Sequence, residues 1–195
     1  SDVSLTNTDN DTSGFTVSPT SGLTTTEAGG TATFTVVLNA QPTANVTVGL
    51  SSSDTTEGTV GPSSLTFTSA NWDTPQTVTV TGVDDSLDDG DIAYAITTAA
   101  ATSADGGYNG LNPSDVSVTN TDNDTSGFTV SAISGNTTES GGTATFTIVL
   151  AAQPTANVTV GLSSTDTTEG TVSPSSVTFT SANWNTPQTV TVTGV

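Results

Sequence analysis

Three acidic stretches of this chain have the residue types that calcium sites use. Five Asp residues lie between Asp84 and Asp91, and the motif Thr-Asp-Asn-Asp occurs at residues 8–11 and again at 121–124. The chain has no Lys, Arg or His to neutralise them. Like charges about 5 Å apart repel by roughly 1 kcal/mol even in a water-like dielectric. Calcium takes roughly six to eight oxygen ligands in flexible geometry, so the sequence predicts bound Ca2+.

The composition excludes several functions. A net charge of −19 over 195 residues argues against nucleic acid and anionic membranes as partners. No apolar run approaches the roughly 20 residues of a membrane span, so no membrane insertion is expected. Cysteine is absent, which removes disulfides, zinc thiolates and thiol nucleophiles. An enzyme would need a nucleophile or base with a shifted pKa, or two carboxyl groups flanking a cleft, and the sequence indicates neither. We therefore expect no catalytic activity.

A long internal repeat organises the chain. Residues 114–130 repeat residues 1–17 with one change, and after a one-residue deletion Glu27 matches Glu139 and Trp72 matches Trp184. A period of this length corresponds to a whole domain rather than a solenoid coil. We predict the final strand of a preceding module at 1–11, a complete module at 12–124, and the first two-thirds of the next module at 125–195.

The predicted fold class is all-β, with tandem immunoglobulin-like seven-strand β-sandwich modules joined head to tail and the last one incomplete. Apolar residues alternate with Thr and other small polar residues at the strand period of two, and Gly, Pro, Asn and Asp turns separate the segments, as in a two-sheet sandwich. The seven predicted strands are 15–17, 31–38, 44–50, 64–68, 76–81, 92–97 and 115–119.

Counting strand ends places most carboxylates at one pole of this sandwich, if successive strands run in opposite directions. Carboxylates at five strand ends then fall at the pole where the chain leaves for the next module, and the cation site is predicted at that junction. Trp72, Asp73, the turn at 39–43 and Asp105 fall at the other pole. The predicted acidic pole holds Glu27, Asp54, Glu57, Asp84, Asp85, Asp91, Asp122 and Asp124.

Three motifs in this order resemble the Calx-β module, a β-sandwich of sodium–calcium exchangers and of large bacterial surface proteins. They are Thr-Glu-Ala-Gly-Gly-Thr-Ala at 26–32, the acidic loop at 84–91, and Thr-Asp-Asn-Asp at 121–124. The usual Asp after the third strand is replaced by Asp54 or Glu57. The resemblance implies calcium ligands at Glu27, Asp84, Asp85, Asp89 or Asp91, Asp122 and Asp124, and the repeat extends the set to Asp9, Asp11 and Glu139.

The near-identical tandem copies resemble the extender region of giant secreted, RTX-type bacterial adhesins. This resemblance implies a secreted or cell-surface protein in which Ca2+ rigidifies module junctions. The partners would be neighbouring modules of the same polypeptide or identical chains. Other domains of the parent protein would reach a distal glycan or surface target.

Two alternatives remain open at this stage. The first is a subunit of a self-assembling extracellular filament or matrix, because the third piece lacks the sixth and seventh strands and would expose unpaired edges. Residues 1–11 could donate a seventh strand to a neighbouring chain, but nothing in the sequence provides the sixth. The second is a carbohydrate-binding, lectin-like module in which Trp72, Asp73 and Tyr108 form a platform.

Overall fold

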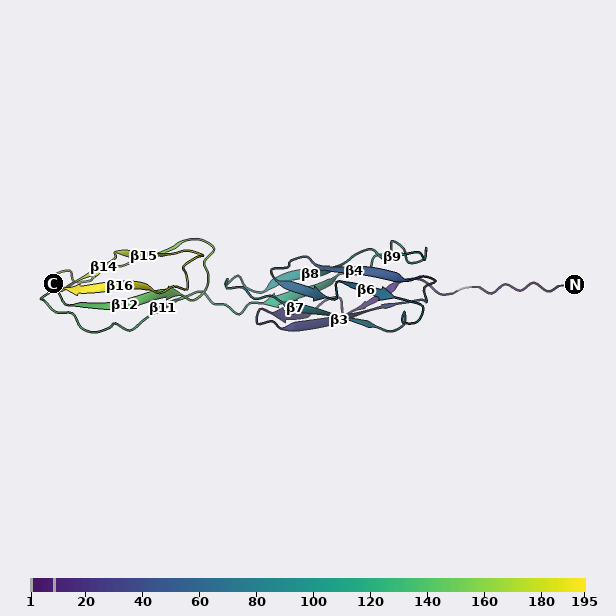
Figure 1. The fold of residues 1–195 in the computed structure, drawn as a ribbon, viewed down its shortest axis with the longest axis horizontal. Coiled ribbons are helices and arrows are strands. Elements are labelled where there is room, and N and C mark those ends of the chain that lie inside the picture. The colour runs from purple at the N-terminus through teal and green to yellow at the C-terminus, as the bar shows by residue number, and fades with distance from the viewer. Residues whose placement is uncertain (1, 9) are drawn as a thin grey trace. The chain divides into compact units, whose positions relative to one another are not determined.

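The described part of the chain consists of β-strands and connecting loops in the computed structural model (Figure 1). The structure describes residues 2–8 and 10–195. Within those residues there is no helix, and so none that is long and apolar enough to cross a membrane. The fold divides into two compact units, one comprising Ser1–Asp85 with Gly90–Asp122 and the other comprising Ser86–Asp89 with Asn123–Val195. We describe the sandwich of each unit separately.

The first sandwich consists of two sheets. One has the strand order β1-β3-β7-β5, and the other has the order β2-β10-β8-β4-β6 with the short β9 beside β4. This order matches the two sheets of an immunoglobulin-type sandwich. The strands are β1 (Phe15–Ser18), β2 (Leu23–Thr26), β3 (Thr31–Leu38), β4 (Val46–Ser52), β5 (Gly58–Gly61), β6 (Ser64–Phe67), β7 (Gln76–Gly82), β8 (Ile92–Thr98), β9 (Thr102–Ser103) and β10 (Val116–Thr121).

One apolar core fills the space between these sheets. In β3, Phe34, Val36 and Leu38 are buried, whereas Thr31 and Thr33 are exposed. The same alternation continues in β10, where Val116 and Val118 are buried. Successive side chains of a strand point to opposite faces, so β-branched residues on one face and Thr on the other are sufficient to specify two half-buried sheets.

All seven predicted strands are present, and the structure adds β2, β5 and β9. Each addition is too short for a period of two to be recognised. The strand β2 contains a single apolar residue, Leu23, β5 begins and ends with glycine, and β9 has two residues. These strands form because they pair with longer neighbours, which is tertiary context rather than local propensity.

The second sandwich repeats only part of this plan. Its sheets have the orders β11-β12-β16-β14 and β13-β15. Within the described residues it has no counterpart of β2, β8, β9 or β10, so its second sheet has two strands. Its strands are β11 (Phe128–Val130), β12 (Thr143–Leu150), β13 (Val158–Gly161), β14 (Gly170–Ser173), β15 (Ser176–Phe179) and β16 (Gln188–Gly194).

A buried tyrosine closes the loop end of the first sandwich opposite the acidic loops. Tyr108 is fully buried, and its ring meets Phe15 edge-on with centroids 5.8 Å apart. Its hydroxyl accepts a hydrogen bond from the Ala40 N–H and donates one to the Ala40 carbonyl oxygen. This hydroxyl therefore satisfies two backbone groups of a turn that belongs to no strand.

Replacing Tyr108 with Phe should destabilise the first sandwich by roughly 1–3 kcal/mol, because two buried backbone groups of Ala40 lose their partner while the ring stays in place. Urea unfolding of a Trp184→Phe background, in which Trp72 is the one remaining tryptophan, measures the change. The second sandwich, followed through Trp184 in a Trp72→Phe background, should be unaffected. An effect below about 0.5 kcal/mol on the first sandwich would contradict this role.

Candidate metal centre

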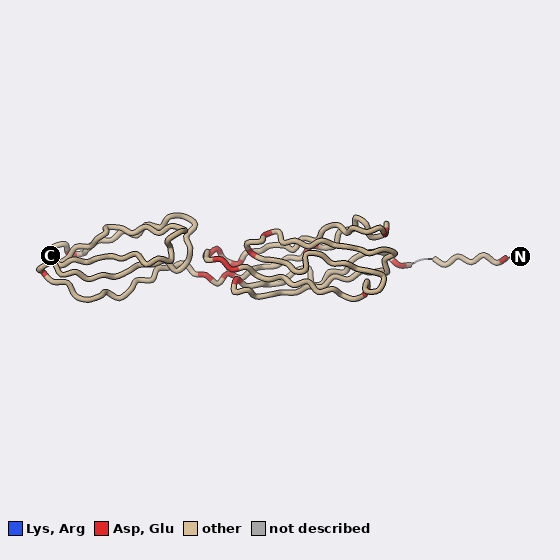
Figure 2. The backbone as a smooth tube through the Cα atoms, viewed as in Figure 1, with Lys and Arg blue, Asp and Glu red and all other residues tan. Residues whose placement is uncertain are grey.

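Loops that are distant in sequence meet at one end of the first sandwich, as the strand count predicted. The Glu27 N–H donates to the Thr121 carbonyl oxygen at 3.1 Å, and the Val83 N–H donates to the Glu57 carbonyl oxygen at 3.0 Å. Figure 2 shows a concentration of acidic residues at that end, with further acidic residues at the opposite end. The opposite end holds the Asp105 carboxylate, which accepts from the Thr43 N–H at 2.7 Å.

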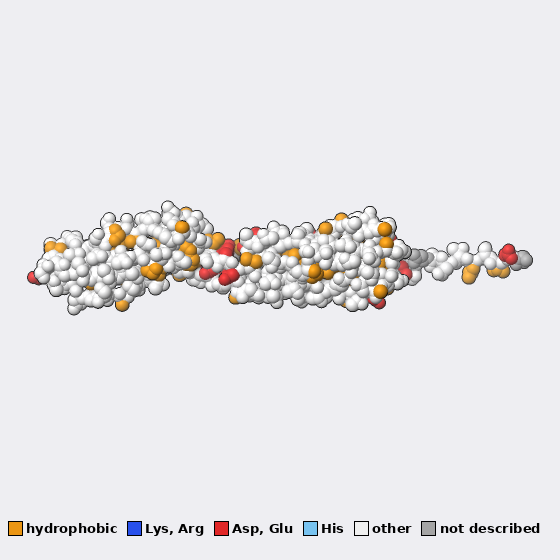
Figure 3. Space-filling view, in the orientation of Figure 1, with side chains coloured by type: hydrophobic (Ala, Val, Ile, Leu, Met, Phe, Trp, Pro, Cys, Tyr) orange, Lys and Arg blue, Asp and Glu red, His pale blue; other side chains and the backbone are white. Residues whose placement is uncertain are grey.

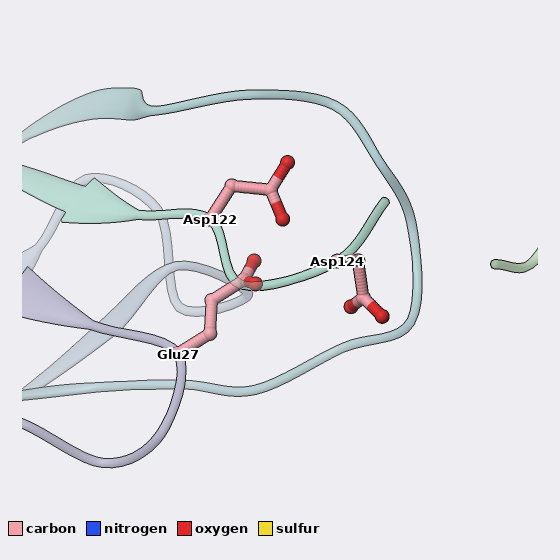
Figure 4. A group of neighbouring side chains, drawn as sticks. All are labelled: Glu27, Asp122 and Asp124. Carbon is pink, nitrogen blue, oxygen red and sulfur yellow. The ribbon is translucent and has the colours of Figure 1, made fainter. Parts of the chain in front are cut away.

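One group of carboxylates consists of Glu27, Asp122 and Asp124 (Figure 4). Glu27 directly follows β2, and the two Asp residues belong to the segment that follows β10. One carboxylate oxygen from each lies within 4.8 Å of the other two. Oxygen ligands about 2.3–2.6 Å from a calcium ion are at most about 5 Å from each other, so this spacing suits a single ion.

A second group consists of Glu57, Asp85 and Asp89. Glu57 immediately precedes β5, and both Asp residues lie in the loop between β7 and β8. One carboxylate oxygen from each again lies within 4.8 Å of the others. The same end of the sandwich therefore holds six carboxylates in two groups of three, each with the dimensions of a cation site.

Each group contains one glutamate that is removed from water. Glu27 is 3% exposed and Glu57 is 6% exposed. Burying an ionised carboxylate costs several kcal/mol unless it is paired or coordinates a metal. No side chain of this chain carries a positive charge, so no side chain of the chain can be an ionic partner of these two glutamates. One buried glutamate in each group distinguishes both groups from an ordinary acidic surface.

Backbone contacts attach the acidic loop to the segment after β10. Gly90 has a φ of 78°, and its N–H donates to the Asp122 carboxylate at 2.8 Å. The Asp122 N–H in turn donates to the Asp91 carboxylate at 3.2 Å. A side chain at position 90 would be strained at this positive φ. Asp91 thus orients the backbone beside the first group.

The structure brings together five of the ten predicted ligands: Glu27, Asp122 and Asp124 in one group, and Asp85 and Asp89 in the other. Asp84 is exposed beside Asp85 and belongs to neither group. Asp11 and Glu139 are exposed and belong to neither group, and Asp9 lies outside the described residues.

Glu57, not Asp54, is the acidic group that the loop after β4 contributes. The Asp54 carboxylate accepts from the Thr56 N–H at 3.0 Å and from the Thr56 hydroxyl at 2.6 Å, and these bonds hold the pKa of Asp54 below its usual value. This arrangement caps a turn. Asp166 makes the same contacts with Thr168 in the second sandwich, again with a lowered pKa.

Sequence reasoning missed Asn120, which connects the strands behind both groups. Its side-chain oxygen accepts from the Thr25 hydroxyl at 2.9 Å, and its amide nitrogen donates to the Glu57 carboxylate at 3.4 Å and to the Val83 carbonyl oxygen at 3.0 Å. The signal was present in the sequence, since Asn120 follows Val116 and Val118 at an inward position of β10. A polar residue at a strand position where the alternation calls for an apolar one indicates a buried hydrogen-bonding role.

The predicted carbohydrate platform does not form as expected. Tyr108 is fully buried and its hydroxyl is used by Ala40, so its ring is not available to stack on a sugar. Trp72 is partly buried and packs against the core. That part of the lectin-like alternative is wrong, because the tyrosine is needed to fill the core.

Comparison with known proteins finds similarity only at the level of structure. No protein-family model matches the chain, and no curated protein matches it.

Among solved structures, the apo form of the Calx CBD1 domain is 18% identical with a TM-score of 0.44, over 56% of this chain and 96% of that one. The calcium-binding domain CBD12 of CALX1.1 is 18% identical with a TM-score of 0.45, over 74% of this chain and 61% of that one. Domains 5–6 of the S-layer protein SbsC are 21% identical with a TM-score of 0.34, over 95% and 85% respectively. At these values the function has to be argued from the site itself.

Proposed function

We propose that this chain is a calcium-binding structural module of a large extracellular bacterial adhesin, in which Ca2+ rigidifies the connection from one module to the next. The observation that carries the proposal is the pair of three-carboxylate groups, each with a buried glutamate, in a chain without a cationic side chain. Neighbouring modules of the same polypeptide or identical chains would be its partners, at the cell surface or outside the cell.

Calcium fits these groups better than other common metals. Every side chain in them offers oxygen, and the chain has no Cys or His to favour zinc. The ligands come from loops, and each group leaves several coordination positions for backbone carbonyl groups and water. Calcium accepts such irregular sets, whereas magnesium demands near-ideal octahedral geometry and gives up its water reluctantly.

A spacer role follows from where the ligands lie along the chain. Asp122 and Asp124 belong to the segment that leads from β10 to β11, and Phe128 begins β11 only four residues after Asp124. An ion bound by these residues and by Glu27 would fix the start of this connection to the end of β2. Repetition of the module would then produce a stiffened rod that holds a distal glycan-binding or surface-binding domain away from the cell.

Calcium should raise the stability of the first sandwich. Extracellular calcium modules have dissociation constants of about 10⁻⁴–10⁻³ M, so each ion contributes roughly 0.4–1.4 kcal/mol at about 1 mM calcium. For a domain of this size the melting temperature should rise by roughly 2–8 °C per ion. Thermal unfolding of the full chain in the Trp184→Phe background, in EDTA and then in calcium, measures the shift, and magnesium should not match it.

Asp124→Asn separates ion binding from simple charge relief. Without calcium this change should raise the melting temperature slightly, because one repelling carboxylate is gone. In calcium it should remove most of the gain at the first group. Asp73→Asn is the matched control, since Asp73 is an exposed acid near the opposite end and should leave the calcium effect unchanged. Equal behaviour of the two variants would show that the acidic end is ordinary surface charge.

Glu57→Gln tests whether the second group binds an ion of its own. Isothermal titration of the full chain should count one calcium ion fewer in this variant, because the buried carboxylate of that group is lost while the isosteric amide keeps the packing. Glu27→Gln should remove a different ion, and the double variant should remove both. A single ion lost equally in all three variants would mean that the two groups form one site.

Rigidification is measurable as a distance distribution. Thr59 and Thr171 are equivalent exposed positions on β5 and β14. The chain has no cysteine, so a thiol-reactive spin label attaches only at Thr59→Cys and Thr171→Cys in the double variant. Calcium should narrow the distribution of distances between them, and Asp122→Asn should restore the breadth seen in EDTA. Equal widths with and without calcium would contradict the spacer mechanism while leaving ion binding intact.

A further inference from the structure

A set of buried polar side chains connects four segments of the first sandwich behind its carboxylate groups. Acidic side chains reach the surface at this end (Figure 3), whereas each member of the set is at most 6% exposed. Every buried side-chain nitrogen and oxygen among the described residues has a hydrogen-bond partner. We call the set the buried network; its members are Thr25 of β2, Tyr94 of β8, Asn120 of β10 and Glu57, which precedes β5.

The hydrogen bonds of the buried network run in one direction, toward Glu57. The Thr25 hydroxyl donates to the Asn120 side-chain oxygen at 2.9 Å. A hydroxyl has one hydrogen to donate, so Tyr94 is the donor in the 3.1 Å contact between the Tyr94 and Thr25 hydroxyls. The Asn120 amide nitrogen donates to the Glu57 carboxylate at 3.4 Å and to the Val83 carbonyl oxygen at 3.0 Å. Both hydrogens of this amide are therefore used.

These partners fix the orientation of the Asn120 amide. The ionised Glu57 carboxylate and the Val83 carbonyl oxygen accept hydrogen bonds and have none to donate. A flipped amide would place its oxygen against both of these acceptors. It would also turn its nitrogen toward the hydroxyl of Thr25, which now donates to the oxygen. The buried network thus keeps a hydrogen-bond donor directed at the Glu57 carboxylate.

Two facing glycines provide the space for the buried network. Gly58 of β5 pairs with Gly82 of β7. A side chain on Gly58 would collide with the Tyr94 hydroxyl, and a side chain on Gly82 would collide with the Asn120 side-chain oxygen. Gly58 directly follows Glu57 in the sequence. Glycine at both positions therefore allows Tyr94 and Asn120 to fill the space next to this glutamate.

The two buried glutamates are positioned by different contacts. Glu27 follows β2, and its N–H donates to the Thr121 carbonyl oxygen at 3.1 Å. Backbone pairing of β2 with β10 thus places Glu27 beside the segment that holds Asp122. The Glu57 carboxylate, in contrast, accepts a side-chain hydrogen bond from Asn120. Loss of the Asn120 amide should therefore affect the second group far more than the first.

We propose that Asn120 is a positioning residue for the second group: its amide holds the Glu57 carboxylate in the orientation that an ion bound with Asp85 and Asp89 requires. This inference rests on the proposed function. Asn120 is not itself a ligand, because its oxygen accepts from Thr25 and its nitrogen can only donate. Residues that hydrogen-bond to metal ligands orient them, and their replacement typically weakens metal binding by about 10–100-fold.

Calcium titration in two backgrounds tests this role. In Glu27→Gln only the second group keeps its buried glutamate, and in Glu57→Gln only the first group does. Asn120→Leu removes the amide and keeps a side chain of similar shape. It should weaken calcium binding about tenfold in the Glu27→Gln background and leave the affinity in the Glu57→Gln background unchanged. Isothermal titration of the full chain measures both dissociation constants.

Tyr108→Phe is the matched control for a loss of stability without a positioning effect. It removes buried hydrogen bonds to Ala40 at the opposite end of the same sandwich. It should lower the stability to urea and change neither dissociation constant. If Asn120→Leu does not fold, Asn120→Thr replaces it. Its hydroxyl stays beside Thr25, but its shorter side chain does not extend to Glu57, so the same selective loss is expected.

The possible results separate this inference from the proposed function. Equal weakening of both groups would show that Asn120 supports only the fold, and this would overturn the proposal. Calcium binding at the second group with unchanged affinity in the Asn120 variants would also overturn it, while leaving the proposed function intact. Absence of calcium binding by the unmodified chain would refute the proposed function and the positioning role together.

Discussion

Repulsion among carboxylates is the constraint on which the end of the first sandwich depends. Glu27, Glu57 and the Asp residues beside them converge from four segments in a chain that has no positively charged side chain. The Glu27 and Glu57 carboxylates are buried, where water screens charge poorly. An ion shared by many oxygens would offset this repulsion and would also tie the segments together. Under the proposed function, stability of the loops and ion binding are therefore two aspects of one interaction.

The direction of the strands brings these carboxylates together without any special local structure. The strands β2, β4, β7 and β10 run in the same direction, so the residues that follow each of them reach the same end of the sandwich. Hydrogen bonds from Gly90 to Asp122 and from Asp122 to Asp91 then fix the local register. The opposite end is closed differently, by the buried ring of Tyr108. One end is thus closed by a buried aromatic ring, while the other gathers two groups of carboxylates.

Much of this was predictable from the sequence. The alternation of apolar residues with Thr identified seven strands, and the parity of their ends located the acidic pole. The short strands β2, β5 and β9 were not predictable, because they exist only through pairing with neighbours. The sequence also could not show that Glu57 rather than Asp54 belongs to the second carboxylate group. That outcome depends on the hydrogen bonds of the Asp54 carboxylate to Thr56. Asn120 gave a readable signal, as a polar residue at an inward position, that was overlooked.

A crystal structure of the chain grown in about 10 mM calcium would show directly whether the two carboxylate groups bind ions. We expect anomalous difference density about 2.3–2.6 Å from oxygens of Glu27, Asp122 and Asp124, and a second peak beside Glu57, Asp85 and Asp89. Ordered carboxylates with no such density at either group would contradict this expectation. The acidic end would then be a solvated surface, and the buried glutamates would have to be held by protonation.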